Sequence, residues 1–345
     1  MFLRFFSLRE QPFGVTPDPR FLYLTPAHRE ALASLFYGID EGRGFMALIA
    51  KPGMGKTTLL VHLLERFRAT AQTAFIFQTQ CSSREFMRFL LAEVGCEVGT
   101  EQDLVSLHEE FNRRLVREAR DGRRFILIVD EAQNLDASVL ETVRLLSNFE
   151  TPRAKLVQIV LAGQPELADK LARPSLSQLR QRISVLSSLT PLPQPETERY
   201  MEHRLRVAGY REGTPFTPAA KRLIGEISEG IPRNINNLCF GALSLGYALQ
   251  QKMIDADVIR EVVADLELSR LASDSRATTI SESAVLQRLR KDLDLVTLDK
   301  KTILTKTQQP PPPPELKADV PTVKEAQAYM QEVIQRLNNW QRSVN

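Results

Sequence analysis

The sequence has 345 residues, of which 43% are hydrophobic and 25% are charged, and its formal net charge is +3. This length can bury a sizeable core, and the composition is typical of a soluble globular protein. The charge is too small to indicate nucleic-acid binding by itself, and no apolar run reaches the ~20 residues of a membrane span. The three cysteines lack metal-ligand spacing. We therefore expect a cytoplasmic protein that reaches the inner membrane, if at all, through a partner.

Five short apolar runs predict strands that are buried on both faces of a sheet. They cover residues 45–50, 73–78, 125–130, 156–162 and 183–189. Helical patterns separate most of these runs, at 57–69, 84–95, 103–120 and 137–149. Alternating strands and helices predict an α/β domain, in which a parallel sheet has helices on both sides.

The proline-rich stretch "TPLPQPE" at 190–196 predicts a linker, and only helical patterns follow it. They lie at 196–208, 217–229, 233–251 and 255–267, and Thr217 is a suitable N-cap for the second of them. The predicted domains are residues 1–192, which include an N-terminal linker segment, a small helical domain at 193–268, and a tail at 269–345.

The tail combines a polyproline spacer at 308–314 with an amphipathic helix predicted at 321–342. Apolar residues from Val323 to Trp340 follow heptad spacing. Two interpretations stay open, because a stripe does not name its partner: the helix packs on the globular body, or it docks on a partner or a second copy. The spacer favours docking through a flexible arm.

The run "AKPGMGKTT" at 50–58 has the spacing of a phosphate-binding loop, except that Ala50 stands where a glycine is usual. Gly53 and Gly55 let successive backbone N–H groups point at phosphate oxygens, and the following helix adds its positive dipole end. Ala50 lies at the edge of the strand, so we expect the loop to bind nucleotide without that glycine. The predicted cofactor-binding residues are Ala50, Lys51, Pro52, Gly53, Met54, Gly55, Lys56, Thr57 and Thr58.

Polar and charged residues in and near this loop predict contacts to nucleotide phosphates and to Mg²⁺, and the family resemblance described below implies that the nucleotide is ATP. Lys56 can reach the β- and γ-phosphates, and the Thr57 hydroxyl can ligate Mg²⁺. The run "RRFILIVDEAQNL" is a buried strand that ends in Asp130 and Glu131. Asp130 is expected to hold the water shell of Mg²⁺, and Glu131 to polarise the attacking water. The alternative is a pair of solvated carboxylates at a strand end.

These elements together resemble an AAA+ ATPase, with a P-loop, an acidic strand end and a helical lid. Four further runs are similar to general secretion pathway ATPases of the ExeA/GspA type, including those of exosortase-linked exopolysaccharide loci. They are "LREQPFGVTPDPRFLYLTPAHREALASLFYGI" near the start, "LAGQPEL" at 161–167, "LRQRIS" at 179–184 and "GIPRNINNLC" at 230–239. The resemblance covers roughly residues 5–268, and more distantly it extends to transposition regulators of the TnsC and MuB kind. It implies strand order 5-1-4-3-2 and a homo-oligomeric ring or filament.

The resemblance also implies roles for single residues. Gln164 matches sensor 1, which orients the water or senses the γ-phosphate, although a turn residue is the alternative. Arg180 or Arg182 would reach the γ-phosphate bound by a neighbouring subunit, and Arg182 is preferred. The alternative for each arginine is an ordinary surface salt bridge. Arg233 matches sensor 2 of the lid.

Three residues outside these motifs are candidates for the adenine side of the site. They are Phe13, Tyr23 and His28. Core packing is the favoured interpretation for each of them.

The predicted function is Mg-dependent ATP hydrolysis that supports a cell-envelope secretion or exopolysaccharide export system, through a protein partner in that machinery. No peptidoglycan-binding domain is recognised after residue 270, so the shorter, exopolysaccharide-linked version fits the length better. A DNA-associated ATPase is an alternative, which the small charge and the absence of a recognisable helix-turn-helix disfavour. A slowly hydrolysing switch is another, which the Asp130–Glu131 pair disfavours.

Overall fold

A computed structural model of the chain describes residues 2–14, 18–99, 101–152 and 154–266. The predicted tail at 269–345, with its polyproline spacer at 308–314 and its amphipathic helix at 321–342, lies outside the described residues. Within the described ranges, no helix is both long enough and apolar enough to cross a membrane.

A five-stranded parallel sheet forms the centre of the larger domain, in the order β2-β3-β6-β1-β7. Its strands are β1 (Phe45–Ala50), β2 (Ala71–Ile76), β3 (Arg124–Val129), β6 (Val157–Gly163) and β7 (Ile183–Leu189). Counted along the chain, this is the predicted order 5-1-4-3-2, and the prediction is confirmed. β1 pairs with β6 on one side and with the edge strand β7 on the other, so the segment after β1 begins at an interior strand of the sheet.

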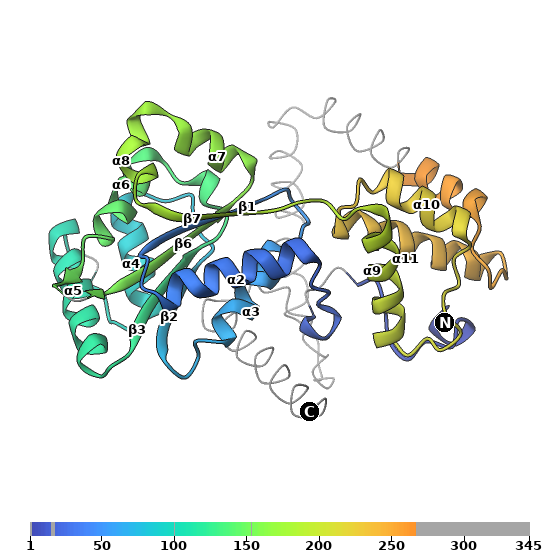
Figure 1. The fold of residues 1–345 in the computed structure, drawn as a ribbon, viewed down its shortest axis with the longest axis horizontal. Coiled ribbons are helices and arrows are strands. Elements are labelled where there is room, and N and C mark those ends of the chain that lie inside the picture. Colours follow the sequence, from blue (N-terminus) through green and yellow to red (C-terminus); the bar gives the residue numbers. More distant parts are fainter. Residues whose placement is uncertain (1, 15–17, 100, 153, 267–345) are drawn as a thin grey trace, which may run out of the picture.

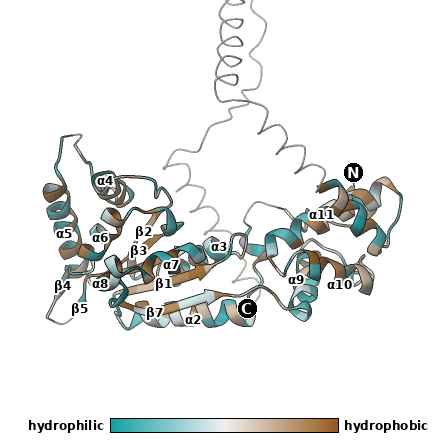
Figure 2. Ribbon diagram, turned by 90° about the horizontal axis from the view of Figure 1, so that it is seen from above, coloured by the Kyte–Doolittle hydropathy of each residue, from teal (hydrophilic) through white to brown (hydrophobic). Residues whose placement is uncertain are grey.

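Alternate residues of each central strand pack into different halves of the core, as expected for a sheet with two buried faces. Met46 and Leu48 of β1 belong to the core on the side of α2 (Pro26–Asp40) and α3 (Lys56–Glu65), whereas Phe45 belongs to the opposite side. The opposite side is covered by α4 (Ser83–Glu93), α5 (Leu104–Arg120), α6 (Ala137–Leu146), α7 (Pro165–Ala172) and α8 (Ser177–Arg180). Figure 1 shows these layers, and Figure 2 shows the apolar strands between helices with polar outer faces. The α/β architecture predicted from the sequence is therefore confirmed.

Some boundaries differ from the sequence-based expectations. β2 begins two residues before the expected position and β3 begins one before, because the two strands pair from Ala71 with Arg124 to Ile76 with Val129. Asp130 consequently lies just beyond β3 instead of inside it. Short elements that the apolar pattern did not predict include α7, α8, the β4 (Glu150–Thr151) and β5 (Ala154–Lys155) hairpin, and the 3-10 turns η1 (Pro19–Phe21), η2 (Ala132–Asn134) and η3 (Pro174–Leu176).

A second group of helices lies beside the sheet domain and is joined to it after β7 (Figure 1). It contains α9 (Gln194–Val207), α10 (Pro218–Ile227), α11 (Pro232–Ala248) and a helix at 256–266. The Thr217 side chain accepts a hydrogen bond from the backbone N–H of Ala220, so the predicted cap of α10 is formed. We call this group the lid.

The N-terminal residues contact the lid, although the sequence analysis grouped them with the sheet domain. The short helix α1 (Phe2–Phe5) packs on α11, where Phe2 meets Phe240 and Phe5 meets Tyr247 edge to face. The backbone N–H of Arg9 donates to the carbonyl of Ala208, which follows α9. We call residues 2–14 the N-terminal strap; the domain boundaries themselves stay a prediction.

Candidate nucleotide-binding site

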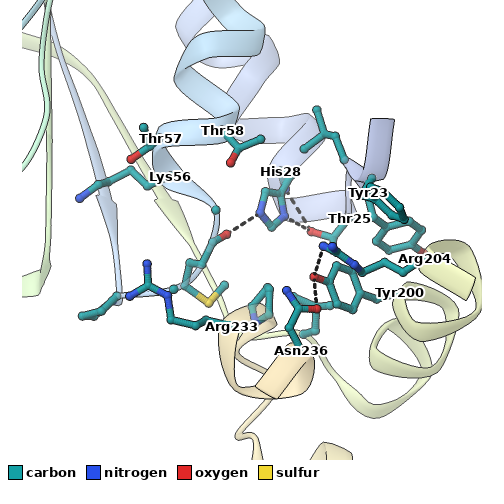
Figure 3. Close-up of a pocket in the computed structure, with 18 of the residues that line it drawn as sticks. Tyr23, Thr25, His28, Lys56, Thr57, Thr58, Tyr200, Arg204, Arg233 and Asn236 are labelled. Atoms are coloured by element: carbon teal, nitrogen blue, oxygen red, sulfur yellow. Dashed lines mark hydrogen bonds between the residues drawn. The ribbon is translucent and has the colours of Figure 1, made fainter. Parts of the chain in front are cut away.

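A cavity of about 300 Å³ lies where the loop after β1, the segment before α2 and the lid meet. Figure 3 shows it, with the loop and Arg233 at one end and Tyr23, Tyr200 and Arg204 at the other. The residues that line it are Gly14, Asp18, Phe21, Leu22, Tyr23, Thr25, His28, Lys51, Pro52, Gly53, Met54, Gly55, Lys56, Thr57, Thr58, Glu131, Leu192, Tyr200, Arg204, Pro232, Arg233 and Asn236. We call the loop end the phosphate end and the other the nucleoside end.

The predicted phosphate loop runs from the end of β1 to the start of α3 at Lys56. Gly53 and Gly55 have φ values of 81° and 84°, a backbone conformation that side chains disfavour. Ala50 is still a strand residue, paired with Leu189 and only 2% exposed, and it does not line the cavity. The site therefore makes no demand at position 50 that only glycine could meet.

The lid touches the phosphate loop directly. The backbone N–H of Arg233, in the first turn of α11, donates to the carbonyl of Gly53 at 3.2 Å. A Cβ atom on Gly53 would lie 2.7 Å from Cβ of Arg233, so only glycine allows this approach. The predicted sensor 2 residue is thus brought to the phosphate end, as is Lys51, whose amine lies 3.8 Å from the Glu229 carboxylate.

Two acidic residues enclose the loop lysine. Nζ of Lys56 lies 2.9 Å from Oε1 of Glu131 and 3.1 Å from Oδ1 of Asp130, and the lysine is 7% exposed. The Thr57 hydroxyl donates to Oδ2 of Asp130 at 2.5 Å. The parallel order of β1, β6 and β3 brings these groups together, because the carboxyl ends of parallel strands meet at one edge of the sheet.

Glu131 is held by two glutamines in addition to Lys56. Its Oε2 accepts from Nε2 of Gln133 at 2.6 Å and from Nε2 of Gln164 at 3.1 Å. Burial raises the pKa of Glu131, but the hydrogen bonds from Lys56, Gln133 and Gln164 outweigh it and lower the pKa to about 2. Its backbone has φ 52°, which is uncommon for a residue other than glycine and occurs at functional sites. The carboxylate is therefore ionised and aimed at the phosphate end.

His28 braces the phosphate loop from the side of α2. One ring nitrogen lies 3.0 Å from the Met54 carbonyl, to which it must donate, so the other accepts the hydrogen bond from the Thr25 hydroxyl at 2.6 Å. Burial lowers the pKa of His28, although the bond to Met54 opposes this, and the neutral ring is the form that fits both contacts. His28 lines the cavity, but its contacts are those of a support rather than a free base-binding group.

Several predicted residues lie outside the cavity. Gln164 reaches it through Glu131, and buried Asp130 reaches it through Lys56 and Thr57. Arg180 donates to the carbonyl of Ala172, and Arg182 donates to the Ser147 hydroxyl at 2.7 Å. Neither arginine contacts the cavity of its own chain among the described residues.

The other candidates for the adenine side separate in the structure. Phe13 is 1% exposed, packs edge to face on Phe216 and does not line the cavity. Tyr23 does line it, and its hydroxyl donates to Glu196 at 2.9 Å.

Comparison with known proteins finds related sequences. Residues 39–171 match the family described as AAA domain. Over 259 residues, or 75% of this chain, the sequence is 38% identical to general secretion pathway protein A of Aeromonas hydrophila. These matches support an AAA+ ATPase that is similar to general secretion pathway protein A. The chain spans 47% of the length of that relative.

Solved structures show the same AAA+ fold at low sequence identity. Cdc6p from Pyrobaculum aerophilum matches with a TM-score of 0.57 and 17% identity, over 72% of this chain and 71% of that one. The ORC2 protein of Aeropyrum pernix, in its ADPNP-ADP complexes, matches with a TM-score of 0.58 and 15% identity, over 94% of this chain and 90% of that one.

The site of this AAA+ ATPase contains residues that sequence reasoning missed. Gln133 lies two positions after Glu131, and Asn236 lies three positions after Arg233. Both are therefore close in the sequence to a residue that was predicted for the site. Asn236 shares a helix face with Arg233, which was a usable signal. Tyr200 and Arg204 of α9 gave no local signal, because their partners lie far away in the sequence.

Proposed function

We propose that the chain binds Mg·ATP in this cavity and hydrolyses it, with Glu131 as the general base. The observation that carries the proposal is the cluster of Lys56, Asp130 and Glu131 at the phosphate end, next to backbone N–H groups of a glycine-rich loop. When ATP binds in the proposed site, Lys56 exchanges the two carboxylates for phosphate oxygens. Its positive charge is paired with negative oxygen atoms both before and after the exchange.

The residues at the phosphate end fit a magnesium ion. The Thr57 hydroxyl and the Asp130 carboxylate lie 2.5 Å apart, and hard oxygen atoms are the ligands that Mg²⁺ prefers. In the proposed site, Thr57 and Asp130 would hold the ion. When bound, Mg²⁺ neutralises charge that develops on the phosphate oxygens.

Hydrolysis then requires one proton transfer by this chain. Glu131 accepts a proton from a water molecule as the water oxygen forms its bond to the γ-phosphorus. The bond between that phosphorus and the bridging oxygen breaks, and the electron pair leaves with ADP. Gln133 and Gln164 hold Oε2 of Glu131, which leaves Oε1 to orient the water once Lys56 contacts the phosphates.

We further propose that the chain acts in the cytoplasm as a homo-oligomeric ring or filament, within a secretion or exopolysaccharide export system. The identity to general secretion pathway protein A supports the secretion assignment. Arg180 and Arg182 support the oligomer, because they lie away from the cavity of their own chain. An arginine finger acts on the nucleotide that a neighbouring subunit binds.

Steady-state phosphate release tests the activity. We expect turnover of ATP that requires Mg²⁺ and that is unchanged by added duplex DNA. No turnover, together with tight ATP binding, would favour a nucleotide-dependent switch. Turnover that rises several-fold with DNA would favour the DNA-associated alternative.

A mixing experiment tests the subunit boundary. One protein carries Glu131→Gln, and the other carries both Arg180→Ala and Arg182→Ala. If an interface combines an intact Glu131 with intact arginines of a neighbour, mixing restores activity that neither protein shows alone. Mixed oligomers without recovery would place the arginines in folding or in their own subunit.

A further inference from the structure

The nucleoside end of the cavity contains a chain of hydrogen bonds that runs between two lid helices. Nη1 of Arg204 lies 3.0 Å from the Tyr200 hydroxyl, and this hydroxyl lies 2.9 Å from Oδ1 of Asn236 (Figure 3). Arg204 is fixed in turn, because its Nε donates to the carbonyl of Pro12 and its guanidinium lies 4.8 Å from the Phe21 ring centre. The chain of bonds therefore starts from an immobilised donor.

The donors and acceptors of these three side chains fix the direction of the hydrogen bonds. An arginine has only N–H groups, so the Tyr200 oxygen must accept from Arg204. The Tyr200 hydroxyl then donates its own hydrogen, and the Asn236 atom that receives it must be the carbonyl oxygen. Burial raises the pKa of Tyr200, so the hydroxyl keeps the proton that it donates. The Asn236 amide is consequently held with its oxygen towards Tyr200.

The amino group of Asn236 is left for the cavity. Asn236 is 9% exposed and lines the cavity, and in the described part of the chain its Nδ2 donates to no protein acceptor. An amide donor that lines a cavity and has no protein acceptor is available to a ligand or to water. The two N–H groups of the Asn236 amide are thus available to a ligand at the nucleoside end.

The position of Asn236 relates it to the phosphate end. Arg233 and Asn236 lie three residues apart on α11, on one face of the helix. Figure 3 shows Asn236 between Arg233 and Tyr200, beyond the phosphate loop. A nucleotide with its phosphates at Lys56 and Arg233 therefore extends its sugar and base towards Asn236.

We propose that Asn236 is a specificity-determining residue, whose Nδ2 donates a hydrogen bond to an acceptor on the nucleoside half of the bound nucleotide. Tyr200 and Arg204 are positioning residues, because they hold the amide in the donating orientation. The acceptor is a ring nitrogen of the purine or an oxygen of the ribose. This inference rests on the proposed function, since it takes the ligand of the cavity to be a nucleotide.

The first test uses calorimetric titration of the full chain with ATP, ADP and inorganic tripolyphosphate. Asn236→Asp keeps the side-chain shape and the acceptor for Tyr200, but it turns the cavity-facing donor into an acceptor. We expect affinity for ATP and ADP to fall about tenfold or more, with affinity for tripolyphosphate nearly unchanged. The matched control is Asn237→Asp on the next, exposed residue of α11, which adds the same charge outside the cavity.

The second test identifies the acceptor with nucleotide analogues. The analogues 1-deaza-ATP, 3-deaza-ATP, 7-deaza-ATP, 2′-deoxy-ATP and 3′-deoxy-ATP each lack one candidate acceptor, either a ring nitrogen of the purine or a hydroxyl oxygen of the ribose. We expect one of them to bind the parent protein more weakly than ATP, and we expect this difference to disappear in Asn236→Leu. Thermal melting of each variant separates a loss of contact from a loss of fold.

Three results would overturn the proposal. They are unchanged ATP affinity in Asn236→Leu, an equal loss for ATP and tripolyphosphate in both Asn236 variants, and a loss in Asn236→Leu that no analogue reproduces. Failure of the parent protein to bind ATP would instead overturn the proposed function and this inference with it. Tyr200→Phe tests the positioning role: it should lower ATP affinity by less than Asn236→Asp does, and unchanged affinity would remove Tyr200 from the account.

Discussion

The two ends of the cavity are built on different principles. The phosphate end is charged and comes mainly from the loop at 51–58 and the end of β3, which parallel strands bring together, with Arg233 added from the lid. The nucleoside end is lined by Arg204 and Asp18, which do not form a direct ion pair, and its polar contacts join segments far apart in the chain. The first end is an arrangement of backbone and charge, and the second is an arrangement of side chains.

This difference explains which residues tolerate change. In the proposed site, backbone N–H groups contact the phosphates at the first end, so most loop side chains should matter less than the glycines that shape the loop. At the second end each contact depends on one side chain and on its orientation. We therefore expect changes at the phosphate end to alter turnover, and changes at the nucleoside end to alter the choice of ligand.

Glu131→Gln should give the largest effect on turnover. The amide keeps the size of the side chain but has lost the basicity that activates the water, so turnover should fall by at least about 100-fold. ATP binding should be retained, and ATP-loaded oligomers should accumulate. Phosphate release and ATP titration measure the two properties separately. Parent-level turnover would remove Glu131 from the role of base.

Lys56→Ala should weaken Mg·ATP binding by about tenfold or more. The variant loses a charge-assisted contact worth roughly 1.5–3 kcal/mol and leaves Asp130 buried without its cation. Calorimetric titration measures the affinity, and a melting curve shows whether the fold survives. Unchanged affinity in a folded variant would contradict the assignment of the phosphate end.

Gln133→Leu should lower turnover by roughly tenfold while leaving ATP affinity close to that of the parent protein. The variant removes one of the hydrogen bonds that lower the pKa of Glu131. The pKa of the base should therefore rise, and because a base works only when ionised, the acid limb of turnover should move to higher pH. A pH profile of kcat measures this shift. An unmoved profile would assign Gln133 to the fold alone.

Ala50→Gly should give the smallest effect, with turnover and ATP affinity within about twofold of the parent values, since a change outside the cavity lining alters no contact with ligand. Ala50 is a buried strand residue that does not line the cavity. The same two assays measure it. A large gain in turnover would show that the missing glycine of the loop is a defect. It would also contradict the view that the side chain at position 50 does not affect the phosphate end.

The sequence predicted the fold for a physical reason, and the residues that it grouped around the phosphate loop lie together in the structure. Buried parallel strands give continuous apolar runs, and a phosphate loop needs glycines and a lysine at fixed spacing within one turn of chain, so both leave local patterns. The strand order came from the family resemblance rather than from such a pattern. The short elements between β6 and β7 were missed because an eight-residue and a four-residue helix carry too little periodicity to stand out.

The nucleoside end could not be predicted in the same way. His28 was considered for the base, but its ring is occupied by Thr25 and by the Met54 carbonyl, and only coordinates show such a pairing. Tyr200 is an ordinary apolar helix position by pattern, and its role depends on Asn236, thirty-six residues further on. A hydrogen-bond chain between two helices has no fixed spacing in the sequence.

The N-terminal strap has a consequence for the order of synthesis. Its contact partners are made long after it: Pro12 meets Arg204 across 192 residues. At about 5–20 residues per second, the strap waits roughly 10–40 s on the ribosome before that partner exists. Phe2, Phe5 and Phe13 are exposed during this interval, because the surfaces that cover them belong to the lid. The strap is therefore open to chaperones and to self-association until the lid has been made.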